Sequence, residues 1–144
     1  MMRHIKRAIL FTLFFYLPLS GMAWGMLGHR IVGQIADSYL TKQARKEIAK
    51  MLGTESIAMT SNWPDFIKSD SSFAYLNNWH YINFKPGLSE TGIKTYLAND
   101  TATDAYTKII WLADQLKNKS LEQTDKLMYL RLLIHIVGDI HQPM

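Results

Sequence analysis

Apolar residues recur at helical spacing along almost the whole chain after residue 25. In residues 26–39 every fourth position from Leu27 to Tyr39 is apolar or aromatic, which is the spacing of one helix face. Residues 121–140 carry a wider apolar stripe at helical spacing. No two-residue hairpin turn joins two extended runs, and no strand pattern alternates with the helical ones. The sequence therefore predicts an all-α fold.

The ends of several helices can be placed from the residues that begin or stop them. Thr41 is a suitable N-cap for a helix over residues 42–52, and Gly53 stands where helices commonly end. A further amphipathic helix is predicted over residues 103–117, beginning at Thr103. The stretch between these helices contains glycines, two prolines and two aromatic clusters, and we expect a looser region there.

Residues 1–23 have the organisation of an export signal. Basic residues precede the apolar run "AILFTLFFYLPLS", and Gly21 and Ala23 are the small residues expected just before a cleavage site. The competing interpretation is a membrane anchor, but the apolar run is short for a span and ends at a good cleavage site. We therefore predict a cleaved signal peptide, an exported protein that is periplasmic or secreted, and no membrane attachment after cleavage. Residues 24–144 then form a single domain.

The charge distribution gives no evidence for nucleic-acid binding, and the cysteine content excludes stabilisation by disulfides. Of the 16 Lys and Arg, three lie in residues 1–23, whereas all 12 Asp and Glu come later. The high pI is therefore largely a property of the leader and is no evidence for nucleic-acid binding. The chain has no cysteine, so disulfides cannot stabilise it. Its stability must come from a hydrophobic core or from bound metal.

A histidine and a carboxylate interrupt the apolar surface of the last predicted helix. His135 and Asp139 are four positions apart within "LLIHIVGDI", so their side chains share one face of the helix. Burial of an unpaired carboxylate is costly, and a metal ion or a cationic partner would remove that cost. The alternatives are a buried hydrogen bond between these two residues, or a salt bridge from Asp139 to Arg131.

Two more histidines stand near aromatic residues. His29 follows Trp24, which becomes the N-terminal residue if the leader is removed, and a free α-amine with its carbonyl can chelate a metal. Asp65 lies in "NWPDFIK" and His80 in "NWHYIN". The alternatives are structural: a core tryptophan, an exposed His29, a helix-start role for Asp65 and a semi-buried His80. Nitrogen and oxygen ligands without a thiolate suit hydrolytic zinc.

Four motifs occur in a fixed order across residues 24–144: "WGMLGH", "WPDFIK", "WHYIN" and "HIVGDIHQPM". As an ordered set they resemble the S1/P1 nuclease family and, more distantly, the zinc-dependent bacterial phospholipases C that share its fold. The resemblance implies a multi-helix bundle of the phospholipase C/P1 nuclease type that holds three zinc ions.

The same resemblance implies metal ligands for two of these ions. The first ion would be held by Trp24, through its amine and carbonyl, and by His29. The ligands of the second would be Asp65, His80 and His135. Asp139 would bridge the two ions.

The implied activity is hydrolysis of phosphodiester bonds in single-stranded DNA and RNA to 5′-phosphorylated products. Asp65 would orient the attacking water in addition to binding metal. Tyr81 would stack on a base, and Asn83 would hydrogen-bond a base edge. Lys68 stands where family members commonly have arginine, and we expect weaker transition-state stabilisation because lysine lacks the bidentate fork. Single-stranded nucleic acid is the expected partner, and no stable protein partner is predicted.

The sequence stops at Met144, within the last motif. The resemblance places the ligands of the third zinc ion beyond this point, and it gives His141 a supporting role. We therefore expect the N-terminal part of a longer protein, truncated before the helices that would cover its last apolar face. Either the sequence is incomplete, or a degraded gene encodes an inactive product. The alternatives in function are a phospholipase C acting on lipid head groups and a non-catalytic exported helical protein.

Overall fold

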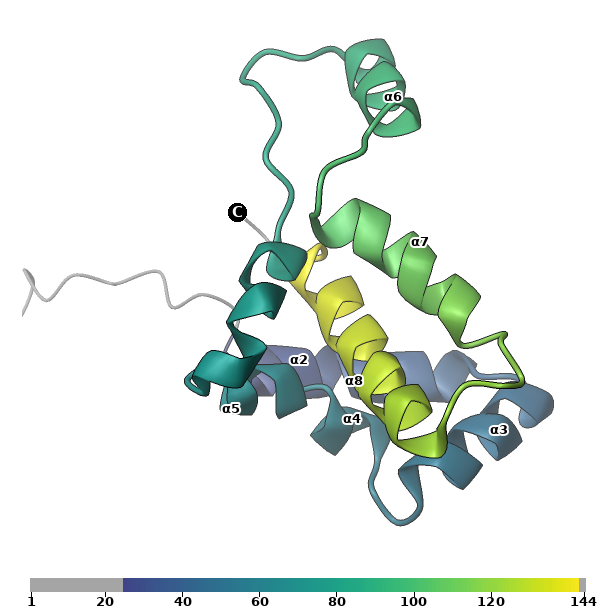
Figure 1. Ribbon diagram of the computed structural model, residues 1–144. Coiled ribbons are helices and arrows are strands. Elements are labelled where there is room, and N and C mark those ends of the chain that lie inside the picture. The colour runs from purple at the N-terminus through teal and green to yellow at the C-terminus, as the bar shows by residue number, and fades with distance from the viewer. Residues whose placement is uncertain (1–24, 143–144) are drawn as a thin grey trace, which may run out of the picture.

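The computed structural model describes residues 25–142, which fold into helices joined by loops (Figure 1). The elements are α2 (Met26–Tyr39), α3 (Lys42–Leu52), α4 (Ile57–Thr60), α5 (Trp63–Ile67), the 3-10 helix η1 (Ser71–His80), α6 (Glu90–Ala98), α7 (Ala105–Gln115) and α8 (Gln123–Asp139). Residues 25–142 contain no strand, so the predicted all-α fold is confirmed. In this part of the chain no helix has both the length and the apolar character needed to cross a membrane. The predicted signal peptide and Trp24 lie outside the described residues.

Side-chain caps account for the ends of several helices. At the start of α3, Thr41 accepts a hydrogen bond of 3.1 Å from the backbone of the first turn, and the helix ends at Gly53, as predicted. The helix predicted to begin at Thr103 begins slightly later, because Asp104 is its N-cap. The Asp104 carboxylate accepts from Thr107 N, and the Thr107 hydroxyl accepts from Asp104 N. This reciprocal pair is a capping box.

The region expected to be loose contains four helical elements: α4, α5, η1 and α6. Ser56, Asp70 and Ser89 begin α4, η1 and α6, and each side chain accepts a hydrogen bond from a backbone N–H. The prediction of a looser region is therefore wrong for most of this segment. Helices α4 and α5 span about one turn each, so no apolar periodicity can develop within them.

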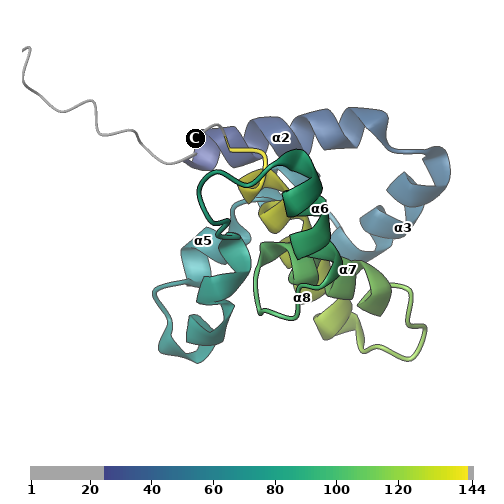
Figure 2. The same cartoon turned by 90° about the horizontal axis from the view of Figure 1, so that it is seen from above.

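Helix α8 lies at the centre of the bundle and contacts α2, α3, α4, α5, α7 and η1 (Figures 1 and 2). Leu132 and Ile136 on α8 are fully buried, in a core that includes Leu112 of α7 and Trp79 of η1. Helix α6 has no buried residue and stands away from the other helices at the end of two connections (Figure 1). Within residues 25–142 the neighbouring helices therefore cover much of the apolar stripe of α8.

Helix α2 has an exposed apolar surface. The residues whose spacing predicted this helix are half or more exposed, from Ile31 at 50% to Tyr39 at 84%. The buried residues of α2 are His29 and Gly33. A Cβ at Gly33 would lie 3.0 Å from Ala58 Cα, so the missing side chain lets α2 pack closely on α4. The periodicity predicts the helix but not the face that it buries.

Candidate metal centre

The carboxylate of Asp139 lies where three histidines meet. Its Oδ1 is 3.3 Å from His29 Nε2. Its Oδ2 is 2.9 Å from His80 Nδ1 and 3.2 Å from His135 Nε2. The two carboxylate oxygens therefore face different histidines, which is an arrangement suited to a carboxylate that bridges two ions.

Three elements far apart in the sequence carry these histidines. His135 precedes Asp139 by one turn on α8, His29 lies on α2, and His80 is the last residue of η1. The ring of His29 stacks on that of His135, with centroids 4.1 Å apart and planes 20° apart. His80 meets His135 edge-on at 4.9 Å. His29 is only 2% exposed, so the alternative of an exposed His29 is wrong.

Gly138 makes room for the His29 ring against α8. A Cβ at position 138 would lie 2.8 Å from His29 Nδ1, which is closer than real Cβ contacts. Within the described part of the chain, that Nδ1 atom is buried without a hydrogen-bond partner. The sequence reasoning missed Gly138. Its only signal was a glycine inside an apolar helix, where glycine normally lowers stability.

Hydrogen bonds from the histidines determine the charge of Asp139. Burial alone would raise the pKa of this carboxyl, because a low dielectric disfavours the charged form. Hydrogen bonds from His135, His29 and His80 outweigh burial and hold the pKa of Asp139 well below its usual range. Asp139 is therefore an ionised carboxylate next to the cavity described below.

Arg131 is not the partner of Asp139. Its Nη2 is 2.6 Å from Glu55 Oε2, and its guanidinium lies 5.2 Å from the centre of the Trp63 ring. The alternative of a salt bridge between Arg131 and Asp139 is therefore wrong. The other alternative pairs His135 with Asp139, and these residues are in close contact: His135 Nε2 is 3.2 Å from Asp139 Oδ2, a separation compatible with metal binding.

The donor atoms and their spacing fit a zinc ion. One ligand atom each from His29, His135 and Asp139 lie within 4.8 Å of one another. Tetrahedral zinc with bonds of about 2.0–2.1 Å to nitrogen needs ligand atoms roughly 3.3 Å apart. The observed separations are similar, since Asp139 Oδ1 is 3.3 Å from His29 Nε2 and Asp139 Oδ2 is 3.2 Å from His135 Nε2. Imidazole and carboxylate without thiolate are also ligands that zinc accepts.

Asp65 and Lys68 lie beside this cluster, within and at the end of α5. Asp65 Oδ2 is 3.9 Å from His29 Nε2, and Asp65 Oδ1 accepts a hydrogen bond of 2.8 Å from Lys68 Nζ. Asp65 follows Pro64 in the first turn of α5, where an acidic residue interacts favourably with the helix dipole. The Lys68 side chain is 61% exposed, so its ammonium group is accessible to a ligand in solution.

A cavity of about 790 Å³ opens beside the cluster. Seven of the residues predicted for the site line it: His29, Asp65, Lys68, His80, Tyr81, Asn83 and Asp139. The Tyr81 ring is half exposed, and its hydroxyl donates to Asn78 Oδ1 at 3.0 Å. The sequence reasoning did not identify Asn77 and Phe84, which also line this cavity.

Trp24 and His141 are predicted residues that the described cluster does not contain. Trp24 lies outside the described residues, although Gly25, which follows it in the sequence, lines the cavity. His141 is exposed and donates from Nδ1 to Val137 O at 2.7 Å, a contact within its own turn of chain. The cluster around Asp139 therefore brings together His29, His80 and His135 but not His141.

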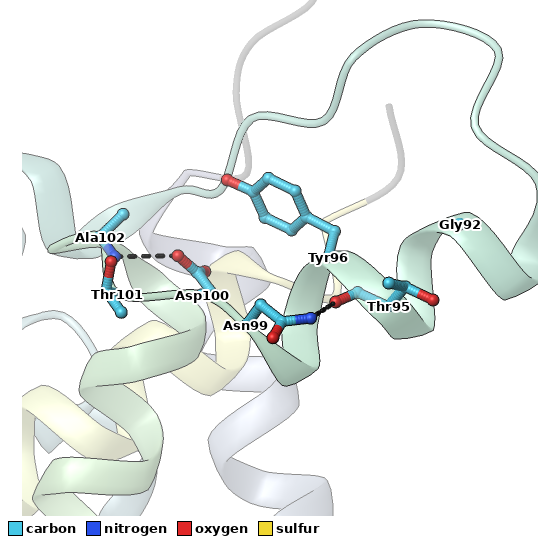
Figure 3. A pocket seen from close by; sticks show the side chains of 7 residues that line it. All are labelled: Gly92, Thr95, Tyr96, Asn99, Asp100, Thr101 and Ala102. Carbon is cyan, nitrogen blue, oxygen red and sulfur yellow. Dashed lines mark hydrogen bonds between the residues drawn. The ribbon is translucent and has the colours of Figure 1, made fainter.

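A second cavity, of about 570 Å³, lies beside α6 (Figure 3). Its polar groups serve local turns: Asp100 Oδ1 accepts from Ala102 N, and Asn99 Nδ2 donates to Thr95 O. None of the residues predicted for the site lines this cavity.

A helical domain that gathers three histidines around a largely buried carboxylate, beside an open cavity, belongs to the class of all-α proteins with a candidate histidine–carboxylate metal site. Within that class, the amino-acid sequence identifies the family. The family described as "S1/P1 Nuclease" matches residues 24–144, and the chain belongs to this family. The resemblance drawn from the four motifs is confirmed.

Several curated relatives bear the names of nucleases. Nuclease S1 of Aspergillus oryzae (strain ATCC 42149 / RIB 40) is 25% identical over 84% of this chain and 43% of its own length. Nuclease P1 of Penicillium citrinum is 25% identical over 84% of this chain and 46% of its own length. Endonuclease 4 of Arabidopsis thaliana is 26% identical over 87% of this chain and 46% of its own length. The chain thus spans less than half the length of these relatives.

Proposed function

We propose that this chain carries part of the active site of a zinc-dependent nuclease, which hydrolyses phosphodiester bonds of single-stranded DNA and RNA to 5′-phosphorylated products. The observation that carries the proposal is the ionised Asp139 held between His29, His80 and His135 at the wall of a cavity. Membership of the S1/P1 nuclease family and the names of the relatives support the same activity.

The proposed zinc ligands form two sets that share Asp139. Its Oδ1 faces the first set and its Oδ2 faces the second. The first set consists of Trp24 and His29, and the second consists of Asp65, His80 and His135. Because the Trp24 amine exists only after removal of the leader, processing during export completes the first set.

The side chains around the cavity have distinct roles in the proposed reaction. Bound zinc supplies Lewis-acid activation of water and neutralises charge on the phosphate. The Oδ2 atom of Asp65, which Lys68 does not bind, accepts a hydrogen bond from the attacking water and orients it. Lys68 binds a non-bridging phosphate oxygen as a point charge.

Tyr81 and Asn83 account for a preference for single strands. Bases of a single strand expose their faces, and such a face can stack on the half-exposed ring of Tyr81. In a duplex those faces are covered by neighbouring bases. The amide of Asn83, on the same cavity wall, hydrogen-bonds the edge of the stacked base.

Hydrolysis assays with defined metal content test this function. We expect a zinc-loaded protein that contains this chain together with the rest of the active site to cleave single-stranded DNA and RNA faster than duplex DNA, to lose activity with a chelator and to regain it with zinc. His80→Ala should abolish cleavage, whereas His141→Ala, outside the cluster, should retain it. Cleavage of phosphatidylcholine but not of nucleic acid would replace the nuclease with a phospholipase C. Absence of any hydrolysis would identify a non-catalytic protein.

We further propose that residues 1–23 are a cleaved signal peptide, that residues 24–144 are the nuclease-like domain, and that the protein is periplasmic or secreted. The intact mass of protein recovered from its native host tests this. A mass that begins at Trp24 supports the proposal. A retained leader would contradict it and would remove the Trp24 amine from the first set of ligands.

A further inference from the structure

Three consecutive polar residues, Thr60, Ser61 and Asn62, lie buried at the end of α4 and before α5. Their exposed fractions are 0%, 1% and 0%. Polar side chains are costly to bury unless their groups are hydrogen-bonded. None of the three is a proposed metal ligand or lines the cavity beside Asp139. The contacts that Ser61 and Asn62 make therefore indicate what this segment does.

The backbone of Ser61 orients a histidine of the metal centre. Its carbonyl oxygen accepts a hydrogen bond of 2.7 Å from His135 Nδ1. Because Nδ1 carries the proton, the lone pair of a neutral His135 is on Nε2, the atom that faces His80 and Asp139. Such a bond fixes both the tautomer and the ring orientation of a metal-binding histidine.

The side chain of Asn62 holds the first turns of α2. In the amide orientation that satisfies both neighbours, Nδ2 donates to Met26 O and Oδ1 accepts from Arg30 Nε, each at 3.0 Å. Met26 and Arg30 are one turn apart, and His29 lies between them. A residue that binds both ends of this turn fixes the position from which His29 reaches the cluster.

We propose that Asn62 is a positioning residue for the metal centre: its amide and the neighbouring Ser61 carbonyl hold α2 and His135 so that the stacked His29 and His135 present their Nε2 atoms to bound metal. This inference rests on the proposed zinc site. One buried segment contacts both helices that supply these histidines. The ligands are thereby preorganised before metal arrives, and preorganisation of this kind raises affinity.

Asparagine is suited to this position because the site needs one donor and one acceptor from the same planar group. In Asn62→Asp a carboxylate oxygen faces the Met26 carbonyl, and no donor remains. In Asn62→Leu the volume is similar, but Met26 O and Arg30 Nε both lose this partner. Both variants should therefore shift α2, and with it His29.

Titration with cobalt(II), read from its visible ligand-field absorption, tests the proposal without depending on activity. All variants are produced as residues 1–144, with the leader included, and their N-terminal residue is identified by mass spectrometry. Circular dichroism of the metal-free proteins reports whether each variant folds. The matched control is Thr60→Val, in the same buried segment, because the Thr60 hydroxyl has no hydrogen-bond partner in the described part of the chain.

We expect Asn62→Asp and Asn62→Leu to bind cobalt about 10-fold to 100-fold more weakly, with an altered absorption spectrum. Thr60→Val should bind like the wild type. Wild-type affinity and spectrum in folded Asn62 variants would overturn the proposal and leave the zinc site intact. A wild-type protein that does not bind cobalt would overturn both.

If the Asn62 variants do not fold, Arg30→Met provides the decisive measurement. It removes one half of the same contact from a partly exposed side chain. A loss of cobalt affinity of at least about three-fold is expected, since Asn62 Oδ1 then lacks its donor. Unchanged affinity in Arg30→Met would overturn the proposal.

Discussion

The imidazole rings of His29 and His135 stack face to face at 4.1 Å, although they come from the first and the last helix of the described chain. Neither ring can take this position without the other helix. The stack forms only when α2 packs against α8, and Gly138 is the point on α8 where the His29 ring fits. The candidate metal centre is therefore a tertiary feature, and its affinity for metal should respond to changes in helix packing.

Gly138→Ala should weaken metal binding. Alanine normally stabilises a helix interior relative to glycine by roughly 0.5–1 kcal/mol. Here the new Cβ would meet His29 Nδ1 at 2.8 Å, and overpacking of this kind costs about 1–3 kcal/mol. We expect a lower free energy of unfolding in urea and a loss of zinc affinity of about ten-fold or more, measured by competition with a chelator.

The same substitution in α6 is the control. The atoms nearest to a Cβ at Gly92 would be side-chain atoms of Leu88 and Ser89, at 3.3 Å and 3.4 Å, and none belongs to the histidine cluster. Gly92→Ala should leave zinc affinity unchanged. If Gly138→Ala binds zinc as tightly as Gly92→Ala, His29 is not held against α8 as described.

Lys68→Met should weaken binding of single-stranded oligonucleotides and reduce its salt dependence. One phosphate contact fewer releases one counterion fewer, so the salt slope should fall by roughly 0.7 for a single strand. Fluorescence anisotropy over a series of salt concentrations measures both effects. Lys68→Arg should bind at least as tightly as the wild type, because guanidinium can bind phosphate through two parallel hydrogen bonds.

Lys117→Met is a matched control for Lys68→Met. Lys117 pairs with Asp114 three residues earlier, as Lys68 pairs with Asp65, but it lies away from the cavity. Its removal should change neither affinity nor salt slope. Equal losses in Lys68→Met and Lys117→Met would mean that general charge, rather than a specific phosphate contact, governs binding.

Asp104→Asn should stabilise the protein relative to the wild type by an amount that increases as the pH rises. Burial raises the pKa of Asp104, a hydrogen bond from Thr107 opposes this, and nearby Asp100 raises the pKa further. A raised pKa in the folded state adds stability that is present below the unfolded value of 3.8 and is lost as the pH rises through the folded pKa. Asparagine retains the N-cap of α7 without this titration.

Urea unfolding at a series of pH values, from about 4 to neutral, measures the effect. The free energy of unfolding of Asp104→Asn minus that of the wild type should increase across the series. Asp104→Ala, which loses the cap, should be less stable by about 1 kcal/mol. A difference between Asp104→Asn and the wild type that does not vary with pH would contradict the assignment.

The fold was predictable where local chemistry determines it. The N-cap Thr41 and the terminal Gly53 gave correct ends for α3, because both act through contacts within one turn of chain. The buried face of α2 was not predictable. Its apolar residues, such as Ile31, face outward, and the helix buries Gly33, whose role depends on contact with α4.

In the candidate site, too, some residues could be predicted from the sequence and others depend on contacts between distant segments. The four motifs pointed to His29, His80, His135 and Asp139, and the structure brings these residues together. Asn62 was not found, because its contacts with α2 are between residues distant in sequence. A polar run directly before Trp63 was the available signal, and only its burial shows that the run is more than a loop.

Tyr81→Ala should lower affinity for single-stranded oligonucleotides while leaving zinc affinity unchanged. Stacking of a base on an aromatic ring is worth about 1–3 kcal/mol, so the expected loss is roughly five-fold to 150-fold. Tyr81→Phe keeps the ring and loses only the hydrogen bond to Asn78, so it should bind nearly as well as the wild type. Tyr39→Ala, on the exposed surface of α2, controls for the loss of any surface aromatic ring. Anisotropy titrations of the three variants with one oligonucleotide separate these cases. If Tyr81→Ala and Tyr39→Ala bind equally well, the cavity does not hold a base at Tyr81, and the basis for single-strand preference must lie elsewhere in the protein.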